Sequence, residues 1–201
     1  MAKITEEQRI LTLVRRFGAI RARDLESHGL SRQALLRLQR RGILDRPARG
    51  LYVLADFETG EHHSLVEAAK LVPAGVICLL SALRFHNLTT QEPFEIWVAV
   101  GNKAWAPRPR APALRLMRFS EHSLTFGVEE HRIEGVAVRI YSPAKTIADC
   151  FKFRNKIGLD VAIEALQDCR RQRKATMDQI WNAAKVCRMA NVMRPYMESL
   201  A

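Results

Sequence analysis

Residues 22–54 read ARDLESHGLSRQALLRLQRRGILDRPARGLYVL, and this stretch decides the fold of the N-terminal part of the chain. Its first seven residues, 22–28, predict a short helix with Leu25 as the inward residue. Gly29 follows and supplies the backbone freedom that a tight turn requires. The stretch therefore begins as a helix that ends in a three-residue turn.

A longer helix is predicted directly after this turn. Ser31 is a good N-cap for a helix over residues 32–41, and Gly42 ends it at the position where a left-handed backbone is common. We expect three leucines to form its apolar side: Leu35, Leu36 and Leu38.

A small hairpin and an earlier helix complete the pattern. Residues 43–44 and 51–54 are apolar and predict two strands, with residues 45–50 as the loop between them. Upstream, Thr5 is a candidate N-cap for a helix that Gly18 ends. Helix, short helix, three-residue turn, helix and basic hairpin make a winged helix-turn-helix, which we predict over residues 1–55.

The net charge is concentrated in this region. The chain carries 32 Lys and Arg against 21 Asp and Glu, which gives a formal net charge of +11 and an isoelectric point near 10.1. Residues 1–54 hold 12 of the basic side chains and 5 of the acidic ones, so they contribute +7. A surplus of this size favours a polyanionic partner.

The predicted second helix of the motif and the hairpin loop supply the candidate DNA contacts. Arg pairs with O6 and N7 of guanine and Gln with N6 and N7 of adenine, and wing arginines contact phosphate or a minor groove. The candidates are Arg32, Gln33, Arg37, Arg40, Arg41, Arg46 and Arg49. Two other interpretations stay open: a solvated charged face, and a winged helix that only docks a protein partner.

A second domain is predicted over residues 62–201, after a polar linker at 56–61. Apolar runs near 76–78, 95–100, 114–118 and 130–141 predict strands, and Glu134-Gly135 predicts a hairpin turn. Three prolines exclude a helix in the segment 101–112. From Ser142-Pro143 onward, four helices are predicted, the third of them capped by Thr176. We therefore expect an α+β chain: a winged helix-turn-helix followed by a mixed α/β domain with a helical, bundle-like end.

Several classes of protein are not expected. The sequence has no run of about 18 uncharged apolar residues for a membrane span, and its start lacks a signal core. The four cysteines are widely spaced, which favours reduced thiols in a cytoplasm. The sequence also has no P-loop, GxGxxG, GxSxG or HExxH, and no histidines at zinc-ligand spacing. We expect neither an enzyme nor a metal or cofactor site.

One cluster in the second domain is a candidate surface for a partner. It comprises Lys145, Lys152, Arg154 and Lys156 on a short helix and the turn after it. We interpret Lys145 and Asp149, four residues apart, as a surface ion pair. The alternative for the whole cluster is a solvated helix end with favourable C-terminal cations.

Three segments resemble the AbiEi antitoxin family of abortive-infection toxin–antitoxin systems. They are GLYVLADF (50–57), GVEEHRIEGVAVRIY (127–141) and SPAKTIADCFKFRNKIG (142–158). The last two are the more specific, because a hairpin leads into a Ser-Pro-capped helix with Lys-Thr-x-Ala-Asp. The resemblance extends over nearly the whole chain.

The resemblance implies a cytoplasmic transcriptional repressor that binds inverted repeats in its own promoter. It also implies neutralisation of a cognate nucleotidyltransferase-like toxin, either directly or only functionally. On such an operator the chain is expected to bind as a dimer, or as cooperative neighbours, whatever its state in solution. The alternatives are a stand-alone regulator and a protein-docking module without a toxin partner.

Overall fold

The structure is a computed structural model that describes residues 5–55, 61–104 and 112–200. The described chain divides into two compact units. The first contains the residues up to Ala74, residues 112–114 and the hairpin segment His131–Val138; the second contains the remaining described residues. The predicted linker residues 56–60 and the prolines at 107 and 109 lie outside the described residues.

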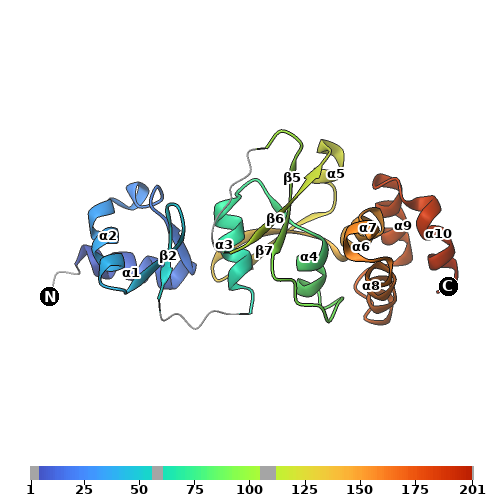
Figure 1. The fold of residues 1–201 in the computed structure, drawn as a ribbon, viewed down its shortest axis with the longest axis horizontal. Coiled ribbons are helices and arrows are strands. Elements are labelled where there is room, and N and C mark those ends of the chain that lie inside the picture. The colour runs from blue at the N-terminus through green and yellow to red at the C-terminus, as the bar shows by residue number, and fades with distance from the viewer. Residues whose placement is uncertain (1–4, 56–60, 105–111, 201) are drawn as a thin grey trace. The chain divides into compact units, whose positions relative to one another are not determined.

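The first unit begins with alternating short helices and strands (Figure 1). In chain order these are α1 (Glu6–Phe17), β1 (Ala19–Arg21), the 3-10 helix η1 (Glu26–His28), α2 (Arg32–Arg40), β2 (Leu44–Ala48), β3 (Leu51–Leu54) and α3 (His63–Leu71). The predicted caps are confirmed: Thr5 forms a capping box with Gln8, and the Ser31 hydroxyl accepts a hydrogen bond from the Ala34 amide. This order is compatible with a winged helix-turn-helix.

The prediction of a helix over residues 22–28 is wrong. Only the single 3-10 turn η1 forms there, after a run of turns. The Asp24 carboxylate accepts a hydrogen bond from the Arg21 amide at 3.3 Å. Such local side-chain bonds compete with helical ones, and with Leu25 as the one buried side chain of this stretch, burial adds little to favour a longer helix.

The hairpin is tighter than predicted. Strand β2 continues to Ala48, so the turn consists of Arg49 and Gly50 rather than of residues 45–50. The register between β2 and β3 shifts between Asp45 and Ala48. Pro47 lies in this irregular stretch, where its missing N–H breaks no regular ladder. Strand β1, which the sequence did not predict, pairs antiparallel with β3 and completes a sheet of order β1-β3-β2.

A five-stranded sheet follows, of order β6-β5-β4-β8-β7. Its strands are β4 (Val76–Ile77), β5 (Ile96–Gly101), β6 (Leu114–Phe119), β7 (Val128–Ile133) and β8 (Val136–Tyr141), with helices α4 (Leu79–Phe85) and α5 (Glu121–Thr125) between them. Strand β4 pairs antiparallel with β5 and parallel with β8. The predicted hairpin over residues 130–141 is confirmed, and its turn residue Gly135 packs within the first unit, beside the Arg16 carbonyl.

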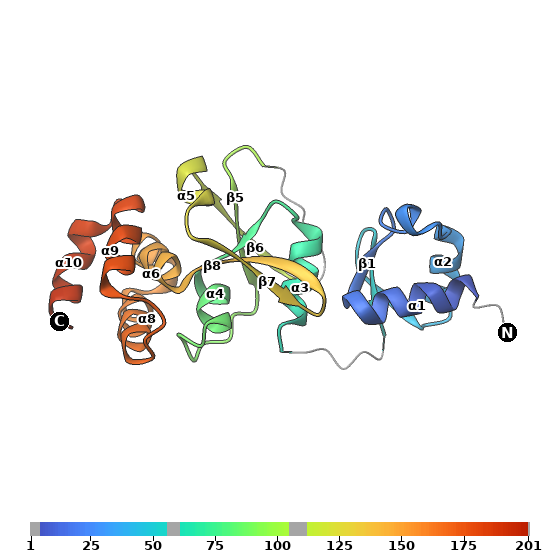
Figure 2. The ribbon, with the colours of Figure 1, turned by 180° about the vertical axis from the view of Figure 1, so that it is seen from behind.

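Helices gather at the C-terminal end of the second unit (Figures 1 and 2). They are α6 (Pro143–Lys152), α7 (Arg154–Ile157), α8 (Leu159–Arg171), α9 (Met177–Val186) and α10 (Ala190–Glu198). Helix α6 packs against α4, α8, α9 and α10, and all of its residues from Ala144 to Phe151 are buried. This central place decides the environment of the polar side chains on α6. The mixed α+β class predicted from the sequence is confirmed.

Candidate nucleic-acid interface

Helix α2 is held by one face and exposes the other. Ala34, Leu35 and Leu38 are buried in the core of the first unit, together with Ile10 and Val14 of α1. At about 100° per residue, the positions opposite this buried face are Gln33, Leu36 and Arg40. All three are exposed. The outer face of α2 thus consists of an amide, an apolar side chain and a guanidinium group.

The prediction that Leu36 lies on the apolar side of this helix is wrong. It is 39% exposed, one of the exposed large apolar side chains among the described residues. The helical wheel predicts this exposure, because position 36 lies about 155° from the mean direction of positions 34, 35 and 38. An exposed apolar side chain at this position suits contact with a thymine methyl group.

One flank of α2 is neutralised by α1. The Glu7 carboxylate binds two guanidinium groups of α2 and its end, with Arg37 Nε 3.1 Å from Oε1 and Arg41 NH1 2.9 Å from Oε2. The two arginines are one helical turn apart, so a single carboxylate reaches both. Both remain more than half exposed. Glu7 therefore occupies, within the molecule, the place of an external anion on these arginines.

The remaining candidates differ in their contacts. Arg32 forms an exposed ion pair with Glu26 at 2.7 Å. Arg46 lies on β2, with its guanidinium carbon 5.8 Å from the centre of the Tyr52 ring. Arg49 is exposed in the hairpin turn. Neither Arg40 nor Arg49 forms an ion pair with another described residue.

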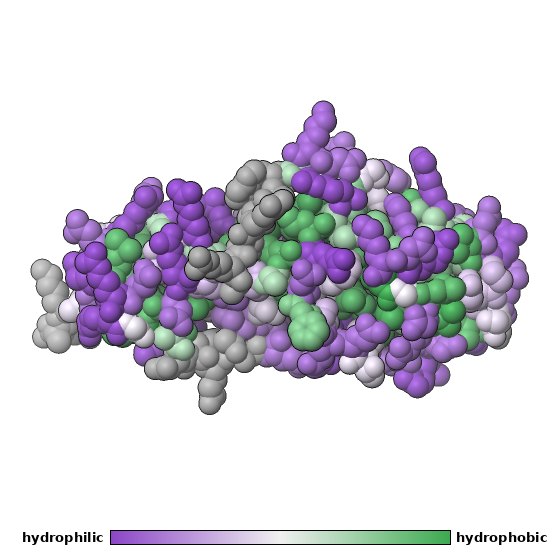
Figure 3. All heavy atoms as spheres, in the orientation of Figure 1, coloured by the Kyte–Doolittle hydropathy of each residue, from purple (hydrophilic) through white to green (hydrophobic). Residues whose placement is uncertain are grey.

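All seven predicted DNA contacts are exposed in the first unit. Figure 3 shows hydrophilic side chains over most of the visible face of this region, at the left. Their exposure meets the first requirement of a nucleic-acid interface, which is access to the phosphates and base edges. Their contact with DNA stays a prediction.

Lys145 differs most from its prediction. Both Lys145 and Asp149 are fully buried, so the interpretation of a surface ion pair is wrong. The physical reason is the central position of α6, which has neighbours on all sides. Lys152, Arg154 and Lys156 are more accessible: the first two are half-buried and the third is exposed. A direct contact between Lys145 and a partner is excluded by its burial in this structure.

The buried pair is well satisfied. The Lys145 ammonium donates to Asp149 Oδ2, lies 3.5 Å from Ser123 Oγ, and is 4.3 Å from the centre of the Tyr141 ring. Asp149 Oδ1 accepts a hydrogen bond from the Cys187 thiol at 3.3 Å. Burial raises the pKa of Asp149, and Lys145 opposes this rise. The environment of Lys145 and Asp149 is therefore that of a structural ion pair.

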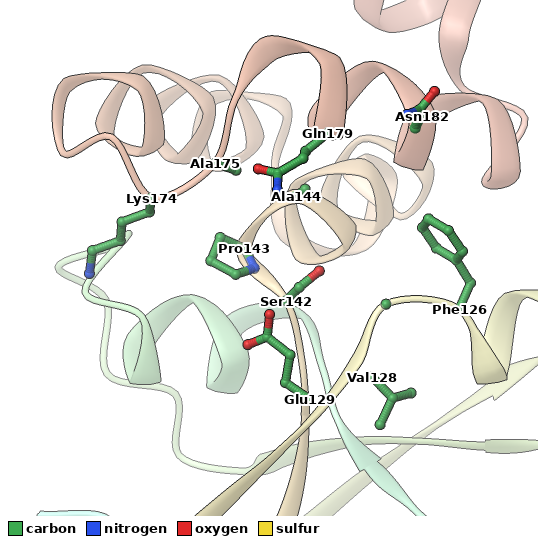
Figure 4. Close-up of a pocket in the computed structure, with 11 residues that line it drawn as sticks. Phe126, Val128, Glu129, Ser142, Pro143, Ala144, Lys174, Ala175, Gln179 and Asn182 are labelled. Atoms are coloured by element: carbon green, nitrogen blue, oxygen red, sulfur yellow. The ribbon is translucent and has the colours of Figure 1, made fainter.

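The described residues of the second unit form at least two pockets. The first has a volume of about 430 Å³. Figure 4 shows the side chains of Glu129, Ser142 and Gln179 pointing into the space between β7 and helices α6 and α9. Gly127 lines it with φ +68°, and a Cβ there would lie 2.7 Å from Lys145 Cβ. The Glu129 carboxylate and the Lys174 ammonium give this pocket both signs of charge. The second pocket, near Cys187, is of a different kind and is described below.

Sequence reasoning missed one pair of ionisable groups in the first unit. His63 Nδ1 of α3 lies 2.7 Å from Glu134 Oε2 in the hairpin turn. The two residues are 71 positions apart, and no local pattern connects them. The other carboxylate oxygen, Glu134 Oε1, is buried without a hydrogen-bond partner among the described residues. Those residues contain no group of three or more His, Cys, Asp or Glu able to hold a metal ion.

Comparisons with known proteins bear on both units. Residues 8–55 match the AbiEi_4 family, described as "Transcriptional regulator, AbiEi antitoxin". The predicted resemblance is thus confirmed over the N-terminal region. The match does not extend to residues 127–158, the more specific part of the predicted resemblance. No curated protein sequence matches the chain significantly.

A solved structure supports the fold of the whole chain. The crystal structure of the RV2827C protein from Mycobacterium tuberculosis superposes with a TM-score of 0.64 and 11% sequence identity, covering 98% of this chain and 79% of that one. At this identity the likeness concerns the fold alone. In the described part of the chain, none of the helices has the length and apolar character needed to cross a membrane.

Proposed function

We propose, from the premise that residues 8–55 match the AbiEi family of antitoxin transcriptional regulators, that this chain binds duplex DNA through α2 and the β2–β3 hairpin. The observation that carries the proposal is the outer face of α2, where Gln33, Leu36 and Arg40 are exposed together. An amide, an apolar group and a guanidinium group are the chemistries that read base edges in a major groove. Residues 1–55 are the proposed DNA-binding domain and residues 62–201 the proposed antitoxin domain.

The finer function follows from the family. We propose a cytoplasmic antitoxin that represses its own operon from an inverted repeat and neutralises a nucleotidyltransferase-like toxin. Two copies on the repeat would lie about 34 Å apart, or a multiple of this, because each copy reads one half-site. Lys152, Arg154 and Lys156 are the proposed antitoxin contacts. The domain is proposed to act without a cofactor or catalysis.

DNA binding is tested with the purified full chain and a fluorescent duplex of its own promoter. With about six phosphate contacts, the logarithm of the affinity falls against the logarithm of salt with a slope near −5. The substitution Arg40→Ala lowers the affinity by about 1–3 kcal/mol, more for the promoter than for a scrambled duplex. Arg171→Ala is the matched control, because Arg171 is an exposed arginine of α8 in the second unit.

The result separates the proposed function from the docking alternative. A salt-independent affinity, or equal affinities of Arg40→Ala and the unaltered chain for the promoter, contradicts DNA reading by α2. If Arg40→Ala then loses a protein partner, the region is a docking module. The antitoxin role is tested by co-expression with the neighbouring open reading frame: rescue from growth arrest supports it, and arrest in the presence of the chain contradicts it.

A further inference from the structure

The second pocket of the second unit has a volume of about 400 Å³, within the range of small-molecule sites. It lies between α5, the end of α6 and the turn after α9. Its lining residues are Ser120, His122, Ser123, Lys152, Val186, Cys187, Arg188 and Met189.

The charged groups of this pocket share one sign. Lys152 and Arg188 are cationic, and His122 becomes cationic when protonated, whereas none of the lining residues carries a carboxylate. Asp149 lies behind the wall, fully buried and paired with Lys145. The adjacent Cys187 thiol stays neutral, because burial and the Asp149 carboxylate raise its pKa to about 12. The pocket is thus a positive site whose nearby negative charge is already compensated.

A buried hydroxyl adds a hydrogen-bond donor. Ser123 is only 2% exposed, and its Oγ accepts a hydrogen bond from the Lys145 ammonium at 3.5 Å. Within the described part of the chain, its own proton is donated to no acceptor. A hydroxyl can donate one bond while accepting others. Ser123, Lys152 and Arg188 therefore offer donors to whatever fills the pocket.

The backbone at Arg188 is also unusual. Its φ is +60°, in the left-handed region that favours glycine. The turn is closed by hydrogen bonds from the Arg188 amide to the Lys185 carbonyl and from the Met189 amide to the Ala184 carbonyl, which is the geometry of a helix end. An arginine thus stands where glycine would meet the backbone requirement, and it places a cation at the pocket.

We propose that this pocket binds a mononucleotide. The phosphate is the acceptor-rich anion that these donors suit. Val186 and Met189 are apolar residues of the same lining and suit contact with the base. The pocket in Figure 4 is the internal contrast, because the Glu129 carboxylate there offsets the charge of Lys174. This inference does not depend on DNA binding by α2.

The test is an NMR titration of the amides of the full chain with AMP, inorganic phosphate and adenosine. AMP is expected to shift the amides of residues 120–123 and 186–189, with weaker binding of phosphate and adenosine. Arg188→Gly, which suits the left-handed backbone, is expected to weaken AMP binding by about tenfold or more. This is the factor in affinity that the loss of one charged hydrogen bond produces. Lys152→Gln is also expected to weaken AMP binding.

The control substitution is Lys185→Gln, which removes an exposed cation of α9 that does not line the pocket. It leaves the AMP affinity unchanged. Equal AMP affinities of Arg188→Gly and the unaltered chain overturn the proposal, as do adenosine binding as tight as AMP and shifts confined to other residues. Shifts of the pocket amides by a short duplex but not by AMP overturn the mononucleotide as the ligand.

Discussion

Each unit contains a carboxylate that binds a cationic side chain, but one such pair is exposed and the other is buried. Glu7 holds Arg37 and Arg41 at the surface, where both arginines remain more than half exposed. Asp149 holds Lys145 in the interior, where neither side chain is exposed. Exposed pairs contribute about 0–1 kcal/mol and exchange readily. A buried pair resists separation, because each charge left alone has lost its water. The difference separates a surface fit for binding from a pair fit for holding a core.

The largest effect is expected at the buried pair. Lys145→Met leaves the Asp149 carboxylate without its cation, and the free energy of unfolding falls by about 3–5 kcal/mol. Urea denaturation followed by circular dichroism measures it. The double variant Lys145→Met with Asp149→Leu recovers most of the loss, because no isolated charge remains. Equal losses for the single and double variants would show that packing, rather than charge, determines this site.

A second test compares two glycines with the same φ of +68°. Gly42→Ala places a methyl group in open space, whereas Gly127→Ala directs it at Lys145 Cβ. Both variants incur left-handed strain of about 1–2 kcal/mol. In Gly127→Ala, overpacking lowers the free energy of unfolding by a further amount of about 1–3 kcal/mol. Denaturation midpoints of the two variants give the difference directly, and equal midpoints would contradict the close packing around α6.

The smallest effect is expected at the surface pair. Glu7→Gln removes the carboxylate shared by Arg37 and Arg41 and lowers stability by less than about 1 kcal/mol. On the proposed function it also raises promoter affinity severalfold, because both arginines lose their internal anion. Fluorescence anisotropy measures this gain. Glu198→Gln on α10 removes a charge of the same sign and serves as the control; a gain of the same size there would make the effect one of net charge alone.

Local signals predicted much of the fold. The caps Thr5, Ser31, Ser142 and Thr176 begin helices as expected, since a cap depends on residues within one turn. The extent of β2 did not follow, because it depends on pairing with β3. The absence of a helix over residues 22–28 did not follow either, because the helical pattern does not register the local bond from the Arg21 amide to Asp24.

The candidate sites show the same difference between features set by local sequence and features set by distant residues. The exposed residues of α2 followed from its periodicity, and Leu36 would have followed from a stricter use of it. The burial of Lys145 did not follow, because the groups around it include Phe119 and Ser123 from a distant part of the chain. Its partner Asp149 is likewise bonded to the distant Cys187. The pocket beside Cys187 has the same origin. It is formed by three segments, at residues 120–123, 152 and 186–189, which are 29 and 34 residues apart along the chain. None of them carries a recognisable motif.

The bridge made by Glu7 has a consequence for the entropy of any association. Arg37 and Arg41 are already restricted in their rotamers before a ligand arrives. Ordering a long side chain at an interface ordinarily costs about 0.5–1.5 kcal/mol. An incoming anion that replaces the Glu7 carboxylate therefore meets two guanidinium groups that have already lost much of this freedom, and the exchange amounts to a swap of one oxygen pair for another.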